Sequence, residues 1–153
     1  MTVLFRIMMM FVGYVWACIV ASLVLALGAL TPEWNSFFDA FGLQSAHAQS
    51  AALWTIVGAG ALIIFALGLL PVLLIIVIAE GFALRSVIVY GIIGGALALA
   101  MAYGLDSYGF GVAISAAAPA RDLAREREVF AAAGIAGGMV YWLFAGRRAG
   151  AWK

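Results

Sequence analysis

Hydrophobic residues are concentrated in long uninterrupted runs along this chain, and the polar residues fall between the runs. The run at 53–79 contains no charged residue, and a short turn with Glu80 and Arg85 separates it from a second run at 87–105. At 1.5 Å per residue the first run makes a helix of roughly 40 Å, longer than the roughly 30 Å hydrocarbon core of a bilayer. We therefore expect two membrane-crossing helices and, because the turn is short, we expect them to be antiparallel neighbours.

Two further apolar runs, at 7–30 and 129–145, complete the pattern. The four runs together predict an all-α polytopic membrane protein, with four transmembrane helices in a single domain that covers residues 1–153. The mixed-charge stretch at 121–128 is expected to continue without a break into the fourth helix. Pro71, within the second run, predicts a kink or a tilt of that helix.

A cleaved signal peptide is the competing interpretation of the first run, because residues 46–48 (Ala-His-Ala) resemble a small-residue cleavage site. The apolar core of a signal peptide is shorter than this run and lies next to its cleavage site. The run at 7–30 is long and ends well before residue 46. We therefore expect it to be a transmembrane helix.

Residues 32–41 mix aromatic and polar residues, and the spacing places the aromatic side chains on one side of a short predicted helix. Pro32 suits the first position of a helix, and Gly42 suits its end. The aromatic residues recur with the i, i+3, i+4, i+7 spacing of an amphipathic helix and are Trp34, Phe37, Phe38 and Phe41. A helix this short cannot span a bilayer, so we expect it to lie at the membrane surface, anchored by its aromatic face. Docking of that face on a partner protein is the alternative.

Composition supports the membrane interpretation and narrows the function. Hydrophobic residues make up 67% of the chain and charged residues 10%, whereas soluble domains carry about 25% charged residues. The formal net charge is only +1, without the basic clusters that nucleic-acid binding needs. Arginine outnumbers lysine and alanine is abundant, as in proteins of GC-rich bacteria, so we expect a bacterial inner membrane.

The basic residues predict the orientation of the four helices. One side of the membrane would hold Arg6, Arg85, Arg147, Arg148 and Lys153, and the other side would hold Arg121, Arg125 and Arg127. Cytoplasmic segments carry the excess of basic residues. We therefore expect a multi-pass protein with both termini in the cytoplasm.

Small residues recur at intervals of four in three of the predicted helices. They are Gly13, Ala17 and Ala21 in the first helix, Gly91 and Gly95 in the third, and Gly134 and Gly138 in the fourth. This spacing lets the backbones of two helices approach closely. We expect these faces to pack helices together or to meet a partner protein, and the spacing leaves open which face is internal.

Chemically reactive residues are scarce in the predicted spans, which contain no acidic, basic or histidine side chain. Proton-coupled carriers and haem proteins need such groups at depth. His47 is expected in a loop, and Cys18, the only cysteine, is expected to be a small buried hydrophobe. We expect no catalytic, cofactor-binding or metal-binding residues, and no enzymatic activity.

Glu80 and Arg85 form the one local charge pair that the pattern singles out. Glu80 would end the second helix and Arg85 would precede the third, so each charge opposes the dipole of its own helix. Pairing between the two side chains would relieve this opposition. The alternative is that each faces a partner subunit.

Two stretches carry a resemblance, AEGFALRS at 79–86 and GIAGGMVYWLFAGRRAG at 134–150. In these stretches the chain resembles small uncharacterised inner-membrane proteins of alphaproteobacteria. The resemblance implies a lineage and a topology, and it carries no function.

These observations favour a small accessory or scaffold subunit of a larger membrane protein complex. Its partners would be the lipid bilayer and other integral membrane proteins or copies of itself, with no nucleic acid. The alternative is a homo-oligomeric channel or carrier whose pathway forms between subunits.

Overall fold

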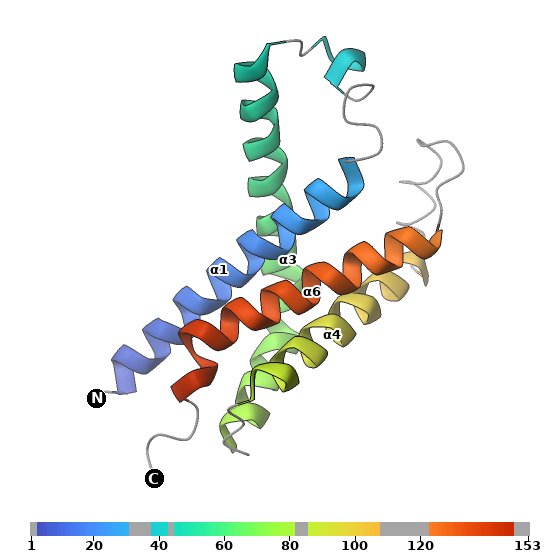
Figure 1. The fold of residues 1–153 in the computed structure, drawn as a ribbon. Coiled ribbons are helices and arrows are strands. Elements are labelled where there is room, and N and C mark those ends of the chain that lie inside the picture. Colours follow the sequence, from blue (N-terminus) through green and yellow to red (C-terminus); the bar gives the residue numbers. More distant parts are fainter. Residues whose placement is uncertain (1–2, 31–37, 43–44, 82–85, 108–122, 149–153) are drawn as a thin grey trace.

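Four long helices make up most of the part of the chain that the structure describes. The computed structural model describes residues 3–30, 38–42, 45–81, 86–107 and 123–148. The helices are α1 (Val3–Leu30), α3 (Ala46–Gly81), α4 (Val87–Ser107) and α6 (Leu123–Phe144), and a single 3-10 turn, η1 (Gly146–Arg148), follows α6 (Figure 1). The described residues contain no strand, so the all-helical prediction is confirmed for them.

Three of these helices are long and apolar enough to cross a membrane. Their candidate spans are Ile7–Gly28 in α1, Ala46–Ile75 in α3 and Val87–Gly104 in α4. α6 contains the predicted fourth run and, as predicted, begins within the charged stretch. Its charged residues 125–128 shorten its apolar part, however, and it is not among the candidate spans. The structure thus supports a membrane protein with three candidate spans, and the fourth span stays a prediction.

α3 begins seven residues before the predicted start at residue 53, because Ser45 caps it. The Ala48 N–H donates to the Ser45 hydroxyl oxygen at 3.2 Å, and the Gln49 N–H donates to the Ser45 carbonyl oxygen at 3.0 Å. A serine in this position satisfies an amide that would otherwise lack a partner in the first helical turn. His47 therefore lies in the first turn of α3, where it is exposed, and its predicted placement in a loop was wrong.

The predicted interfacial helix at 32–41 falls mainly outside the described residues, and Trp34 and Phe37 lie there. Residues 38–40 are helical. Gly42 then turns the chain with a φ of 67°, and its N–H donates to the Asp39 carbonyl oxygen at 3.0 Å. Phe38 is only 1% exposed whereas Phe41 is 68% exposed, so these two aromatic side chains have different surroundings. A surface helix over 32–41 stays a prediction, with the expected glycine at its end.

The helices pack in the order α3, α1, α6, α4 rather than in chain order. α1 packs along both α3 and α6, and α6 also packs along α4 (Figure 1). Neighbouring helices are antiparallel, since Gly13 lies at Phe144 near one end of the α1–α6 pair and Gly28 lies at Val129 near the other. α1 and α6 therefore form the middle of the molecule, with α3 and α4 on either side.

The expectation that the second and third apolar helices are neighbours is not met in the described residues. α3 and α4 are not among the helix pairs that pack along their lengths, and α3 crosses the other helices steeply in Figure 1. A short connection fixes only the distance between two helix ends. The contacts of α3 are instead with α1, whose Ser22 and Tyr14 hydroxyls lie against Gly60 and Gly68.

The length of α3 also bears on its orientation in a bilayer. Its 36 residues continue through Pro71 and make a helix of about 54 Å. That length exceeds the roughly 30 Å hydrocarbon core, so the helix has to tilt in the bilayer or extend beyond it. Pro71 has no N–H, so it cannot donate the usual helical hydrogen bond to the Leu67 carbonyl.

Candidate functional site

The glycine-rich faces of α4 and α6 contact one another within the same chain. Gly94 of α4 and Gly134 of α6 lie backbone to backbone, and a Cβ added to either residue would overlap the carbonyl oxygen of the other. A Cβ at Gly138 would overlap the Tyr90 carbonyl oxygen in the same way. These glycines let α4 and α6 approach as closely as two backbones can.

Gly91 and Gly95, the glycines singled out on α4, lie beside the centre of this contact. A Cβ at Gly91 would meet the Ile135 side chain at 3.6 Å, and one at Gly95 would meet it at 3.0 Å. The closest approach runs instead through Gly94 and Ala98. In a helix rich in glycine and alanine, two adjacent faces both show a spacing of four, so the spacing alone could not select between them.

The small residues of α1 pack on a different side of α6. A Cβ at Gly137 would lie 3.2 Å from the Ala17 carbonyl oxygen and 3.4 Å from the Ala21 Cβ, and one at Gly13 would lie 3.0 Å from the Phe144 Cβ. The predicted stripe of Gly13, Ala17 and Ala21 is therefore brought against α6. Its partner Gly137 lies between the two glycines of the predicted motif and was missed.

Hydroxyl groups of α1 donate hydrogen bonds to backbone carbonyls of α3. The Ser22 hydroxyl donates to the Val57 carbonyl oxygen at 2.8 Å, and the Tyr14 hydroxyl donates to the Phe65 carbonyl oxygen at 2.9 Å. Ser22 is only 3% exposed. Sequence reasoning gave these residues no role, although an isolated hydroxyl in an apolar run is a usable signal, because a polar group in hydrocarbon needs a partner.

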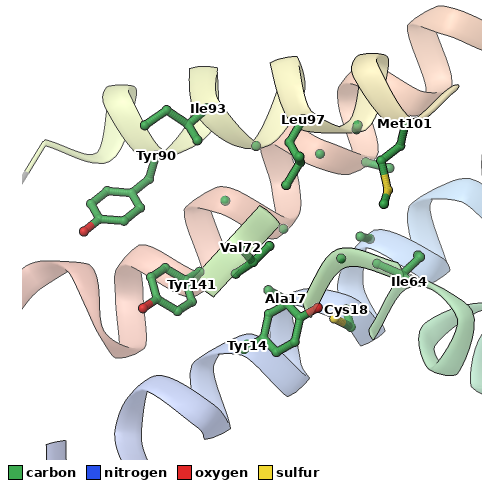
Figure 2. Close-up of a pocket in the computed structure, with 18 of the residues that line it drawn as sticks. Tyr14, Ala17, Cys18, Ile64, Val72, Tyr90, Ile93, Leu97, Met101 and Tyr141 are labelled. Carbon is green, nitrogen blue, oxygen red and sulfur yellow. The ribbon is translucent and has the colours of Figure 1, made fainter. Parts of the chain in front are cut away.

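An apolar groove lies between α3 and α4, with α1 and α6 beneath it. Its cavity volume is about 170 Å³. Figure 2 shows Ile93, Leu97 and Met101 of α4 on one side and Ile64 and Val72 of α3 on the other. The remaining lining residues are Tyr14, Ala17, Cys18, Ala21, Leu25, Gly68, Ile75, Tyr90, Gly94, Ala98, Phe130, Ala133, Gly134, Gly137, Gly138 and Tyr141.

None of the residues that line the groove is acidic, basic or histidine. Within the part of the chain that the structure describes, no group of three or more His, Cys, Asp or Glu side chains gathers. Cys18, predicted to be a small buried hydrophobe, is buried and lines the groove. What the arrangement can do is hold apolar groups.

Arginine–aromatic pairs mark the two ends of α6. The Arg127 guanidinium lies over the Tyr103 ring of α4, 4.9 Å from its centroid. After the last turn of α6, the Arg147 guanidinium lies 6.0 Å from the centroid of the Trp142 ring. Arginine and aromatic side chains are the residues that collect at the two edges of a bilayer.

The predicted pair of Glu80 and Arg85 is only partly within the described residues. Glu80 falls near the end of α3, as expected, and Arg85 lies outside the described part of the chain. A bond between the two stays a prediction.

Comparison of the chain with protein-family models, with curated proteins and with solved structures found no match.

Proposed function

We propose that the protein is an accessory or scaffold subunit of a larger complex in a bacterial inner membrane, and that α3 is the helix that meets the partner. The support comes from which helices the small residues contact. The glycines of α1, α4 and α6 discussed above contact helices of their own chain, whereas a Cβ at Gly58 of α3 would meet nothing within 4 Å. Gly58 is therefore the observation that carries the proposal.

The surroundings of Gly58 suit a helix–helix contact. α3 lies at the edge of the helix order and packs along α1. Its exposed surface includes Thr55, Ala59 and Ala66, which are small and fall near the same face as Gly58. Helices in membranes associate through van der Waals contact and close backbone approach, which small exposed residues permit. Leu62, which is 71% exposed, lies on the same face one turn from both Gly58 and Ala66, and Leu70 lies one turn beyond Ala66.

The same proposal includes α6 as a fourth membrane span. α6 runs along α4 from the Tyr103–Arg127 pair to the contact of Tyr90 with Gly138, so both helices occupy the same depth. Arg127 and Arg147, the arginines of the two arginine–aromatic pairs, are separated by about 30 Å along a helix, which matches the thickness of the hydrocarbon core. Both chain termini then lie on the cytoplasmic side, where the basic residues are more numerous.

Reporter fusions test this topology. A reporter after Arg85 and one after Lys153 should both be active in the cytoplasm, and one placed within 36–50 should be active in the periplasm. A fusion after Lys153 that reports the periplasm, while the other two behave as expected, would show that α6 does not cross.

Leucine substitutions at two open glycines test the role of α3. Gly58→Leu should abolish co-purification of the partner in mild detergent, because the larger side chain holds the partner helix away. The matched control is Gly104→Leu in α4, where a Cβ also meets nothing within 4 Å. This control should leave the co-purified set unchanged. Equal loss with both variants, or retention with both, would contradict the proposal.

A flux assay separates this function from a homo-oligomeric channel or carrier. The pure protein in liposomes should pass neither ions nor small solutes, because the described spans offer no charged side chain to line a path. Flux through pure wild-type protein that is lost in Gly58→Leu would replace the scaffold proposal with the channel.

A further inference from the structure

The groove between α3 and α4 has the properties of a binding site in its own right, separate from the partner surface around Gly58. We propose that it holds one linear acyl chain of a bilayer lipid, which enters sideways between the two helices. The groove is formed by a single chain, so its occupation by a lipid does not depend on the scaffold function.

The length of the groove suits an extended hydrocarbon chain. Its lining residues on α4 run from Tyr90 to Met101, a distance of about 17 Å along the helix. On α6 they run over a similar distance, from Phe130 to Tyr141. A slot of this length and of about 170 Å³ accommodates part of a fatty acyl chain.

The volume of the groove favours a chain over a helix. Its 170 Å³ is close to the roughly 150 Å³ of an apolar protein cavity that stays dry and binds benzene. A transmembrane helix has a diameter of about 10–12 Å with its side chains and is too wide for such a space. Without an occupant, the side chains that line the groove would lack van der Waals partners on that side.

The walls and floor of the groove are matched to methylene groups. Gly94, Gly134, Gly137 and Gly138 are among the residues that line the groove. Ile93 and Leu97 form an aliphatic wall (Figure 2). The Tyr14 hydroxyl at the edge already donates to the Phe65 carbonyl. None of the residues that line the groove is charged, so the lining suits an acyl chain and offers no charge to a lipid headgroup.

The open side of the groove explains how a chain reaches it. α3 and α4 diverge instead of packing together along their lengths, which leaves the groove open between them. The lining residues of α1, α3 and α4 belong to the candidate spans, at the depth where lipid tails surround a membrane protein. An acyl chain can therefore enter from the bilayer without passing through water.

Photolabelling with a lipid tests this site directly. The purified protein is placed in phosphatidylcholine vesicles that contain a phosphatidylcholine with a photoactivatable diazirine in its acyl chain. Labelled positions are then mapped by mass spectrometry. We expect groove residues, such as Val72 and Leu97, to be labelled more strongly than outward-facing Ile92. Equal labelling of groove and outward surfaces would overturn the proposal.

A pair of adjacent tryptophan substitutions supplies the matched control. Ile93→Trp places a large ring in the groove and should lower its labelling at least about threefold. Ile92→Trp, at a residue that is 65% exposed, should leave groove labelling unchanged. Ile64→Trp repeats the test from the α3 side if Ile93→Trp loses its helical circular dichroism. Groove labelling that persists in folded groove variants would also overturn the proposal.

Vesicles of phosphatidylglycerol, with a photoactivatable phosphatidylglycerol, complete the experiment. Because the site holds a chain and not a headgroup, groove labelling should be the same in both lipids. Labelling that requires the anionic lipid would contradict an acyl-chain site and point to recognition of the headgroup.

Discussion

Gly134→Ala is expected to lower the free energy of unfolding by about 1–3 kcal/mol, although it adds a single methyl group. The added Cβ would overlap the Gly94 carbonyl oxygen and come within 2.6 Å of the Ala98 Cβ. Backbone atoms cannot rotate away as a side chain can, so α4 and α6 have to separate. Association inside lipid depends on this packing, because apolar side chains gain little by leaving a hydrocarbon environment.

Gly104→Ala is the matched control, since it makes the same change in a helix where the new Cβ meets nothing within 4 Å. There the substitution should be neutral or stabilising by up to about 1 kcal/mol, because alanine is the better helix former. Unfolding in mixed dodecyl maltoside and sodium dodecyl sulfate micelles, followed by circular dichroism, measures both variants. If the unfolding midpoints of Gly134→Ala and Gly104→Ala shifted equally, the contact at Gly134 would contribute nothing specific to stability.

The contact between α1 and α3 gives the second large effect, and a pair of substitutions should reveal it as a coupling. A Cβ at Gly60 would overlap the Ser22 hydroxyl oxygen. In Gly60→Ala the hydroxyl has to turn away and loses its bond to the Val57 carbonyl. We expect the free energy of unfolding to fall by about 1–2 kcal/mol, because interhelical hydrogen bonds of this kind contribute up to about 1.7 kcal/mol to stability.

Ser22→Ala alone should cost about 1 kcal/mol through the same lost bond. Adding Gly60→Ala to Ser22→Ala should then cost little more, since the methyl would lie 3.5 Å from the Cβ of residue 22, an ordinary contact. The double variant should therefore be less destabilised than the sum of the single variants. Gly58→Ala serves as the reference for an alanine substitution on α3 without a contact. If the changes in unfolding free energy of Ser22→Ala and Gly60→Ala added strictly in the double variant, the result would contradict the contact.

The positions of the helices could be predicted from the sequence because they depend on local properties. A run of apolar residues must form a helix in hydrocarbon, where every backbone group has to be satisfied internally. The start of α3 was misplaced because the cap by Ser45 depends on one side chain, and apolar periodicity does not detect it. Gly42, in contrast, was placed correctly because a glycine at the end of a helix is a local signal.

The arrangement of the helices could not be predicted in the same way. Small-residue spacing identifies a face that permits close approach, but it does not name the helix that approaches. The sequence therefore selected Gly91 and Gly95, while the contact uses Gly94. The groove depends on how α3 and α4 lie relative to one another, and its lining comes from all four helices, so no local pattern in the sequence marks it.

The order α3, α1, α6, α4 has a consequence for the biosynthesis of the protein. α1 and α3 can pair as soon as α3 leaves the ribosome, because the hydrogen bonds of Ser22 and Tyr14 to α3 need no later segment. α4 is made next but packs along α6, the last helix in the chain. Since synthesis proceeds from the N-terminus, the glycine face of α4 is without its partner until translation is nearly complete. A ribosome that stalls before residue 134 therefore leaves in the membrane a paired α1–α3 hairpin and an α4 whose closest-packing surface is still uncovered.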